Sequence, residues 1–310
     1  MKRNLLLLGL AALTGFTGAR AEDVTPEAFK FNNQTSLTIT DAQGGANSTN
    51  GNAPGSITAE CGPGVASTFV PKLKAMNLNL VESKWGKLLM IKGEASSVEE
   101  GLSSAGLNTG WWNFCFMGPE CEIDQVYRVT VQSMLVAADN ADDSKFISAT
   151  YLNGGNKKGD RADILASDSE GWYQTQLQAT MGAKTSSYFR FGMPAGLMNE
   201  CALYIYEVRF EKNPTGDIYN SSNEGDPGEE NPIGWQATSL KPSFSTSNAF
   251  VTWGGGKVYI NKAEGQQVEI YSVSGQRVAS FVAKNNLQEV QLGAGIYVVN
   301  IAGESTKVVL

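Results

Sequence analysis

Apolar and polar residues alternate along most of the chain with the two-residue period of half-buried β-strands. In the segment QVYRVTVQSMLVA, the apolar residues Tyr127, Val129 and Val131 alternate with polar residues. Similar short segments, bounded by Gly, Asn, Asp or Pro, are KLLMIKG, WWNFCF, KFISATYL, WYQTQLQAT, SYFRFGM and CALYIYEVRFEK. This many short strands separated by turn residues predicts an all-β fold built as an antiparallel two-sheet sandwich.

The last of these segments, CALYIYEVRFEK, is the longest clear alternation. Uninterrupted alternation places Tyr204, Tyr206, Val208 and Phe210 on one face of the strand, because successive side chains point to opposite faces. The other face then begins with Leu203 and continues through every second residue.

Two segments without apolar periodicity divide the chain. Residues 41–56 are rich in Gly, Asn and Ser, and residues 213–234 combine prolines, glycines and acids. Such compositions resist packing and are typical of linkers. The predicted division is an N-terminal extension with a flexible linker (22–56), a β-sandwich body (57–212), a linker (213–234) and a C-terminal β-sandwich (235–310).

The C-terminal segment alternates as well. Val268 and Ile270 share one face of a predicted strand, and Ile296 and Val298 share a face of another. About 60 residues is near the lower limit for an independently folding domain, so a small sandwich is expected here.

The N-terminus has the features of a secretory signal peptide over residues 1–21. Lys2 and Arg3 precede an apolar run, and Ala19 and Ala21 are small residues at the positions that a signal peptidase recognises. The run is too short to span a bilayer, and no later segment approaches the roughly 20 apolar residues of a transmembrane helix. We therefore expect export to the periplasm, the cell surface or the extracellular space.

Charge and composition exclude several functions. The whole chain has a formal charge of −7 and no histidine. Cleavage after Ala21 would leave 21 basic against 31 acidic residues, without the basic clusters that nucleic acids require. Without imidazole, Ser-His-Asp and Cys-His catalysis and the usual catalytic zinc sites are excluded in their ordinary form. Glycoside hydrolysis, which needs two carboxylates, is compatible with this composition.

The four cysteines, Cys61, Cys115, Cys121 and Cys201, follow the predicted signal peptide, so export would allow them to form disulfides. The sequence does not choose among the pairings. Cys115 with Cys121 and Cys61 with Cys201 is the favoured scheme, and buried thiols are the alternative.

The segments VEIYSVSGQRV, LGAGIYVVNI and STKVVL resemble, in order and in distance from the terminus, the C-terminal sorting domain of type IX secretion substrates. The resemblance covers residues 250–310. It implies a small Ig-like β-sandwich that engages an outer-membrane secretion machinery.

The strand order of residues 85–212 resembles the galactose-binding-like jelly rolls of carbohydrate-binding modules, which implies a jelly-roll-like body. Many of these modules carry a structural calcium and end in an Asp-containing strand, where Glu207 of IYEVRF stands here. The acidic cluster of Asp139, Asp142 and Asp143 lacks the glycine and terminal glutamate of an EF-hand loop and is predicted to be a hairpin tip. No cofactor is predicted, and a structural calcium has no support beyond this resemblance.

Aromatic residues beside amides are candidate sugar-binding residues, because rings stack on the C–H faces of sugars and amides bond to hydroxyl groups. The candidates are Trp111, Trp112, Asn113, Trp172, Tyr173 and Gln174. Adjacent strand residues point to opposite faces, so at most one aromatic residue of each pair lines a given surface and the other belongs to the core.

The leading hypothesis is therefore a non-enzymatic protein that binds glycans. The alternative is an adhesion or scaffold protein that binds other surface proteins. A glycosidase is the third hypothesis, since acids such as Glu207, Asp160, Asp163 and Glu170 are available. No pair of them is predicted to converge, and no catalytic residue is assigned.

Overall fold

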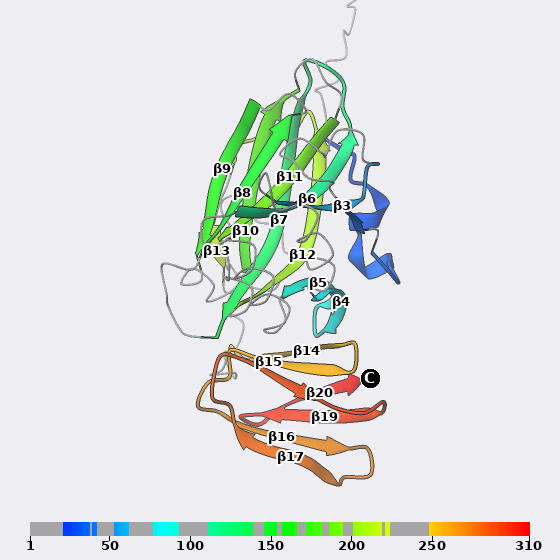
Figure 1. The fold of residues 1–310 in the computed structure, drawn as a ribbon, viewed down its shortest axis with the longest axis vertical. Helices are drawn as coiled ribbons and strands as arrows, with labels where there is room; N and C mark the ends of the chain where they lie inside the picture. Colours follow the sequence, from blue (N-terminus) through cyan, green and yellow to red (C-terminus); the bar gives the residue numbers. More distant parts are fainter. Residues whose placement is uncertain are drawn as a thin grey trace, which may run out of the picture.

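The computed structural model describes residues 21–37, 39–41, 53–61, 77–92, 111–138, 146–153, 157–165, 172–181, 186–194, 201–218, 221–223 and 248–310. These residues form β-strands, apart from turns and two short 3-10 helices, η1 (Glu27–Phe29) and η2 (Phe31–Asn33). The predicted all-β class, a jelly-roll-like antiparallel sandwich followed by a smaller sandwich, is confirmed (Figure 1). The predicted signal peptide lies outside the described residues.

The described strands form three sheets. Sheet A is ten-stranded, in the order β13 (Ser221–Asn223), β10 (Trp172–Thr180), β7 (Val126–Ala137), β12 (Cys201–Lys212), β5 (Gly86–Lys92), β4 (Asn77–Ser83), β14 (Phe250–Gly254), β15 (Lys257–Asn261) and β18 (Leu287–Gln291), with β1 (Glu22–Asp23) also paired to β12. Sheet B has the order β2 (Ile39–Asp41), β3 (Ile57–Cys61), β6 (Trp111–Glu120), β11 (Ser186–Pro194), β8 (Phe146–Asn153) and β9 (Lys157–Leu165). Sheet C has the order β17 (Arg277–Val282), β16 (Gln267–Ser272), β19 (Ile296–Ile301) and β20 (Glu304–Val309). All the strand pairs are antiparallel except β2 with β3.

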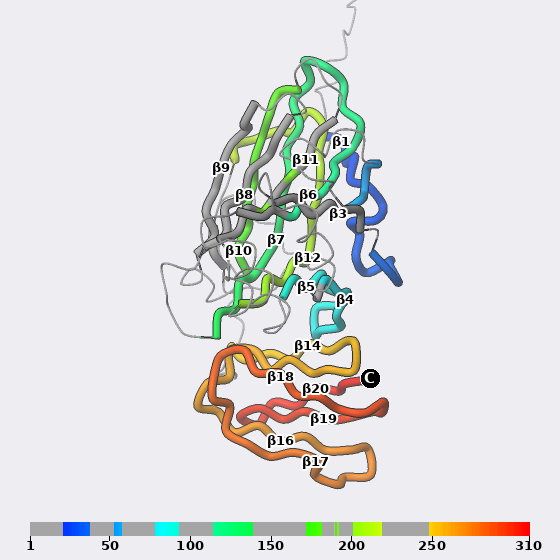
Figure 2. Tube along the Cα trace, viewed as in Figure 1, coloured from blue at the N-terminus to red at the C-terminus, as the bar shows by residue number. Residues whose placement is uncertain are grey.

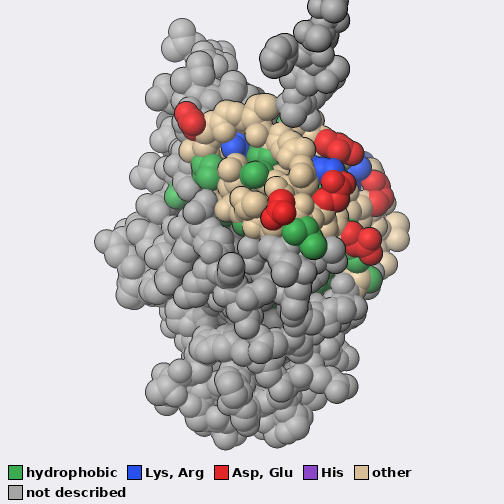
Figure 3. Space-filling view, turned by 90° about the horizontal axis from the view of Figure 1, so that it is seen from above, with side chains coloured by type: hydrophobic (Ala, Val, Ile, Leu, Met, Phe, Trp, Pro, Cys, Tyr) green, Lys and Arg blue, Asp and Glu red, His purple; other side chains and the backbone are tan. Residues whose placement is uncertain are grey.

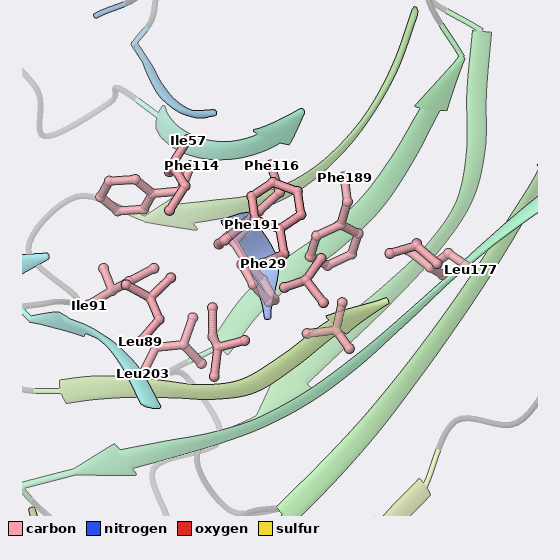
Figure 4. Packing of buried hydrophobic residues seen from close by; sticks show 14 of the residues in the cluster. Phe29, Ile57, Leu89, Ile91, Phe114, Phe116, Leu177, Phe189, Phe191 and Leu203 are labelled. Carbon is pink, nitrogen blue, oxygen red and sulfur yellow. The ribbon is translucent and has the colours of Figure 1, made fainter. Parts of the chain in front are cut away.

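The core of the body lies between sheet B and the strands of sheet A that precede the tail. Figure 4 shows phenylalanines of β6 and β11 facing leucine and isoleucine side chains of β5 and β12, with Phe29 of η1 inserted among them. The Phe29 ring lies 5.6 Å from that of Phe116 in an edge-to-face arrangement. The N-terminal extension is thus part of the core of the body.

A β-bulge interrupts β12. Its pairing with β7 shifts between Ile205 and Glu207, which leaves Tyr206 as the extra residue. Leu203 and Ile205 before the bulge and Val208 after it all point into the core of the body. The predicted uninterrupted alternation was therefore wrong, because one inserted residue exchanges the two faces of a strand.

The C-terminal sandwich packs β14, β15 and β18 of sheet A against sheet C. Its core contains Val251 and Ile260 from sheet A with Val268, Ile270 and Val299 from sheet C, all buried. This part lies below the body in Figures 1 and 2 and follows the predicted amphipathic pattern, including the shared face of Val268 and Ile270. We refer to residues 248–310 as the tail.

Sheet A continues from the body into the tail. β14 pairs with β4 at Thr252↔Ser83 and Trp253↔Glu82. The hydroxyl group of Tyr204 on β12 donates a hydrogen bond of 2.9 Å to Oδ1 of Asn261, and the Thr252 hydroxyl donates to the Tyr204 oxygen over 3.2 Å. These hydrogen bonds are buried, so the tail packs directly on the body.

The beginning of the predicted linker is attached to the body. The backbone N–H of Asn213 donates to the Val126 carbonyl over 2.8 Å. The buried guanidinium of Arg128 donates to the carbonyls of Thr215 and Gly216 at 3.1 and 2.7 Å. Strand β13, within the same predicted linker, also pairs with β10. The division into a body and a C-terminal domain remains our proposal, with a connection that is bound to the body over residues 213–218 and 221–223.

No disulfide joins the cysteines whose side chains the structure describes, Cys115, Cys121 and Cys201, all of which are buried. Cys115 packs with Met117, whereas Cys121 belongs to the core of the body. An extended strand separates residues six positions apart by roughly 20 Å, and a disulfide requires Cα atoms within about 7 Å. The favoured pairing of Cys115 with Cys121 is therefore not formed; the side chain of Cys61 lies outside the description.

Candidate functional site

A pocket lies beside one edge of β12, between the part that pairs with β5 and the part that pairs with β1. β5 pairs with β12 as far as Ile205, and β1 pairs with it at Glu211 and Lys212. Between these two pairings the N-terminal segment crosses the edge and forms one wall of an open cavity of about 200 Å³. We call this cavity the β12 pocket.

The N-terminal wall of the pocket contains Asp23, Thr25, Lys30, Asn32 and Asn33. Backbone hydrogen bonding places it, since the Val24 N–H donates to the Phe210 carbonyl over 2.9 Å. The Phe210 N–H in turn donates to the Thr25 hydroxyl over 2.9 Å.

Two phenylalanines and one asparagine hold this wall against the body. Phe29 and Phe31 also line the pocket, and both are buried in the core of the body. Oδ1 of Asn32 accepts a hydrogen bond of 2.8 Å from the Lys87 N–H. A Cβ atom on Gly86, which has a φ of +101°, would lie 2.4 Å from that oxygen, so glycine is required beside Asn32.

The opposite wall is the bulged part of β12, with Tyr206, Glu207 and Arg209. The bulge brings Tyr206 and Glu207 together on this side. Nε of Arg209 lies 3.8 Å from Oε1 of Glu207, and both side chains are partly exposed. The Tyr206 ring contacts the buried Trp172 ring with centroids 6.2 Å apart.

The pocket contains charges of both signs. Burial of Asp23 favours its neutral form, but hydrogen bonds from the hydroxyl and N–H of Thr25 outweigh burial and lower the pKa of Asp23. The pKa of Lys30 is raised by its hydrogen bond to Glu27, and the two groups are 2.9 Å apart. Seen from above, acidic and basic side chains lie next to one another on the right side of the described surface (Figure 3).

The predicted site residues on β10, Trp172, Tyr173 and Gln174, do not line this pocket. Trp172 is 1% exposed and packs edge-to-face on Trp85, with centroids 5.2 Å apart. Tyr173 points to the opposite face and packs against the core of the body, and Gln174 is buried. Trp172 is covered on its face of sheet A by Trp85, whereas Tyr173 is partly exposed, and a role for Tyr173 in ligand binding stays a prediction.

The other predicted group begins β6. The backbone of Trp111, Trp112 and Asn113 pairs with Pro194, Met193 and Gly192 of β11. Their side chains lie outside the description, as do those of Asp160 and Asp163. A role for these residues in ligand binding stays a prediction.

Sequence reasoning assigned no role to residues 22–60 and named Glu207 only as an available acid. The signal that could have found the pocket is the polar-aromatic set of Tyr206, Glu207 and Arg209 at the end of a core strand. The N-terminal wall gave no such signal, because its position depends on contacts with residues more than 50 positions away, such as Lys87 and Phe210.

Asp139, Asp142 and Asp143 lie outside the described residues. Within the part of the chain that the structure describes, no group of three or more His, Cys, Asp or Glu side chains could hold a metal ion. The same residues contain no helix that is long and apolar enough to cross a membrane.

Residues 241–310 match a family model described as a domain of unknown function, DUF6383. The match coincides with most of the predicted C-terminal domain, and the resemblance to a type IX sorting domain stays a prediction. No curated protein sequence matches the chain.

Several solved structures resemble the fold at low sequence identity. The apo form of a cyclase from Fischerella sp. has 11% identity and a TM-score of 0.37, covering 64% of this chain and all of its own. A putative sugar-binding protein from Bacteroides thetaiotaomicron has 10% identity and a TM-score of 0.33, covering 62% of this chain and all of its own. The CBM22-1 xylan-binding domain of Paenibacillus barcinonensis Xyn10C has 10% identity and a TM-score of 0.26, covering 44% of this chain and 82% of its own. With TM-scores this low, the likenesses carry no argument about what this chain does.

Proposed function

We propose that the chain is an exported, non-enzymatic glycan-binding protein and that the β12 pocket is its binding site. The observation that carries the proposal is the convergence of Tyr206, Glu207 and Arg209 with the polar N-terminal wall around one cavity. Sugars are bound by an aromatic surface for their C–H groups together with carboxylate, amide and guanidinium groups for their hydroxyls. Side chains of all these kinds line the pocket.

The electrostatics of the pocket favour binding over hydrolysis. A glycosidase needs one carboxyl group with a raised pKa to protonate the leaving oxygen. The two carboxyl groups that line the pocket are Asp23 and Glu207. The pKa of Asp23 is lowered, and Glu207 is paired with Arg209. The environment of Asp23 is therefore not that of a general acid.

A glycan-array screen of the purified chain tests the proposal. The full chain is required because the tail packs on β12 through Tyr204. Tyr206→Ala and Arg209→Ala are expected to remove binding, whereas Trp112→Ala is expected to keep it. If Trp112→Ala alone removes binding, the site lies at β6 and the pocket assignment is wrong.

The tail provides matched controls. Arg277 forms an ion pair of 3.2 Å with Glu269, as Arg209 does with Glu207, and Tyr271 is a partly buried tyrosine beside it. Arg277→Ala and Tyr271→Ala are expected to leave binding unchanged. A blank array for the folded chain would overturn glycan binding in favour of adhesion to proteins.

A further inference from the structure

We infer that the β12 pocket accepts one uncharged sugar unit at the end of a glycan, and that it rejects acidic sugars and internal units of a polysaccharide. The inference rests on the proposed function and adds the ligand class. Three properties of the pocket lead to it: its ends, its volume and its pairing of charges.

Both ends of the pocket along β12 are closed by hydrogen bonds. At one end the Phe210 backbone is bonded to Val24 and Thr25. At the other end the Lys87 N–H is bonded to Asn32. A polysaccharide that ran along the strand would have to displace a segment that Phe29 anchors in the core of the body. A polysaccharide therefore cannot continue along β12 on both sides of the pocket, which favours a chain end as the ligand.

The volume agrees with a single unit. The cavity of about 200 Å³ is smaller than the roughly 300–1,000 Å³ of pockets that hold drug-sized ligands. One pyranose ring is smaller than such ligands, whereas two linked rings approach their size. A second sugar unit would extend out of the pocket.

The two cationic groups that line the pocket each already lie beside a carboxylate. Arg209 faces Glu207 at 3.8 Å, and Lys30 faces Glu27 at 2.9 Å. Asp23 is held as a carboxylate by Thr25. A carboxylate on the ligand would lose its hydration on entering the pocket. It would gain no new partner in return, because Arg209 and Lys30 each already lie beside an anionic side chain. Its partial burial would therefore cost free energy. The hydroxyl groups of an uncharged sugar meet no such penalty, because they can donate to Glu207 and accept from Arg209.

The test uses matched pairs of small glycosides on the full chain, with affinity measured by calorimetry. The probes are methyl glucoside with methyl glucuronide, and methyl galactoside with methyl galacturonide, which differ only in the carboxylate. One neutral glycoside is expected to bind at least about tenfold more tightly than its acidic counterpart, equivalent to about 1.4 kcal/mol. An oligosaccharide that carries the same sugar at its non-reducing end is expected to bind as the monosaccharide does.

A charge-changing variant sharpens the test. Glu207→Gln removes one of the two carboxylates near Arg209, the other being Asp23, so the affinity ratio is expected to shift toward the acidic glycoside by roughly tenfold. Glu269→Gln removes the carboxylate from the corresponding pair in the tail and is expected to leave the ratio unchanged. A purely structural role for Glu207 would lower both affinities together.

The failures of the two proposals can be told apart. Tighter binding of an acidic glycoside, or equal binding of an internal sugar unit, would overturn this inference while glycan binding by the pocket stands. If neither the array nor any glycoside shows binding, the proposed function fails and this inference fails with it.

Discussion

Trp172 and Tyr206 lie on the same outer face of sheet A and touch, yet their surroundings differ. Trp172 is 1% exposed, whereas Tyr206 is half-buried and lines the β12 pocket. Around Trp172 the face is apolar, with Tyr204 nearby, and the Trp85 ring contacts both Trp172 and Phe250 of the tail. Around Tyr206 the face is charged and the N-terminal segment crosses it.

The difference shows that the exposure of an aromatic residue on a strand depends on the segments that cover it. An apolar neighbourhood attracts an apolar cover, because burial of apolar surface is favourable. Covering a charged surface costs free energy, because the charged groups lose their hydration. The tail therefore closes the face at Trp172, and the N-terminal segment leaves a cavity beside Tyr206.

The largest expected effect that separates the two residues is on stability. Trp172→Ala should lower the free energy of unfolding by about 3–5 kcal/mol, because it leaves a cavity in a core. Tyr206→Ala should lower it by less and should act chiefly on glycan binding. Denaturant unfolding and the glycan array together measure both; a Trp172→Ala variant of unchanged stability that loses only binding would reverse the comparison.

Tyr204→Phe should have the next largest effect, about 1–3 kcal/mol, because Asn261 and Thr252 lose a buried partner. Denaturant unfolding measures the loss. Val251→Ala, within the tail core, is the control that weakens the tail without changing these hydrogen bonds. A Tyr204→Phe variant as stable as the parent would show that the polar contact between body and tail contributes nothing.

The same tyrosine predicts a loss of stability in alkali. Burial raises the pKa of Tyr204 well above its ordinary value of 10.0. The stability contributed by its neutral form is fully present below pH 10 and is lost as the pH rises above that value. Thermal unfolding of the parent should therefore move to lower temperature above pH 10, and Tyr204→Phe should reduce this dependence. Equal alkaline slopes for the two proteins would contradict the assignment.

A smaller effect is expected at low pH, on the glycan affinity of the β12 pocket. Because the pKa of Asp23 is lowered from its ordinary 3.8, its carboxylate stabilises the folded N-terminal wall above that pH and loses this effect as the pH falls below it. Glycan affinity should weaken below about pH 4 in the parent. The affinity of Asp23→Asn should change less over the same range, and an identical pH profile for both would exclude Asp23 as the cause.

Cleavage of the chain between the body and the tail should have the smallest effect, because the two parts should stay bound to each other. We expect mild proteolysis to cut within the predicted linker, residues 213–234, and to leave two fragments. Since Phe250 and Tyr259 pack in one buried cluster with Tyr204, the fragments should elute together by size exclusion without denaturant. Separate elution would show that the tail is held to the body mainly by the connecting chain.

Local pattern predicted much of the fold. The alternation in QVYRVTVQSMLVA and WYQTQLQAT correctly predicted β7 and β10, because side-chain period is a property of neighbouring residues. It also placed Trp172 and Tyr173 on opposite faces, as observed. Pattern did not predict that Trp172 is fully buried, because the elements that cover it come from distant parts of the chain.

The sequence by itself determined the all-β class, the described strand segments that its alternation predicted, and a composition without histidine that restricts the chemistry. Only the tertiary structure decided the bulge at Tyr206 and the packing of the tail on the body. Only it brought Asp23 and Arg209, which are far apart in the sequence, to one cavity. The physical reason is that strand formation depends on local periodicity, whereas a pocket depends on which distant segments cover the strand and what charge they bring to it.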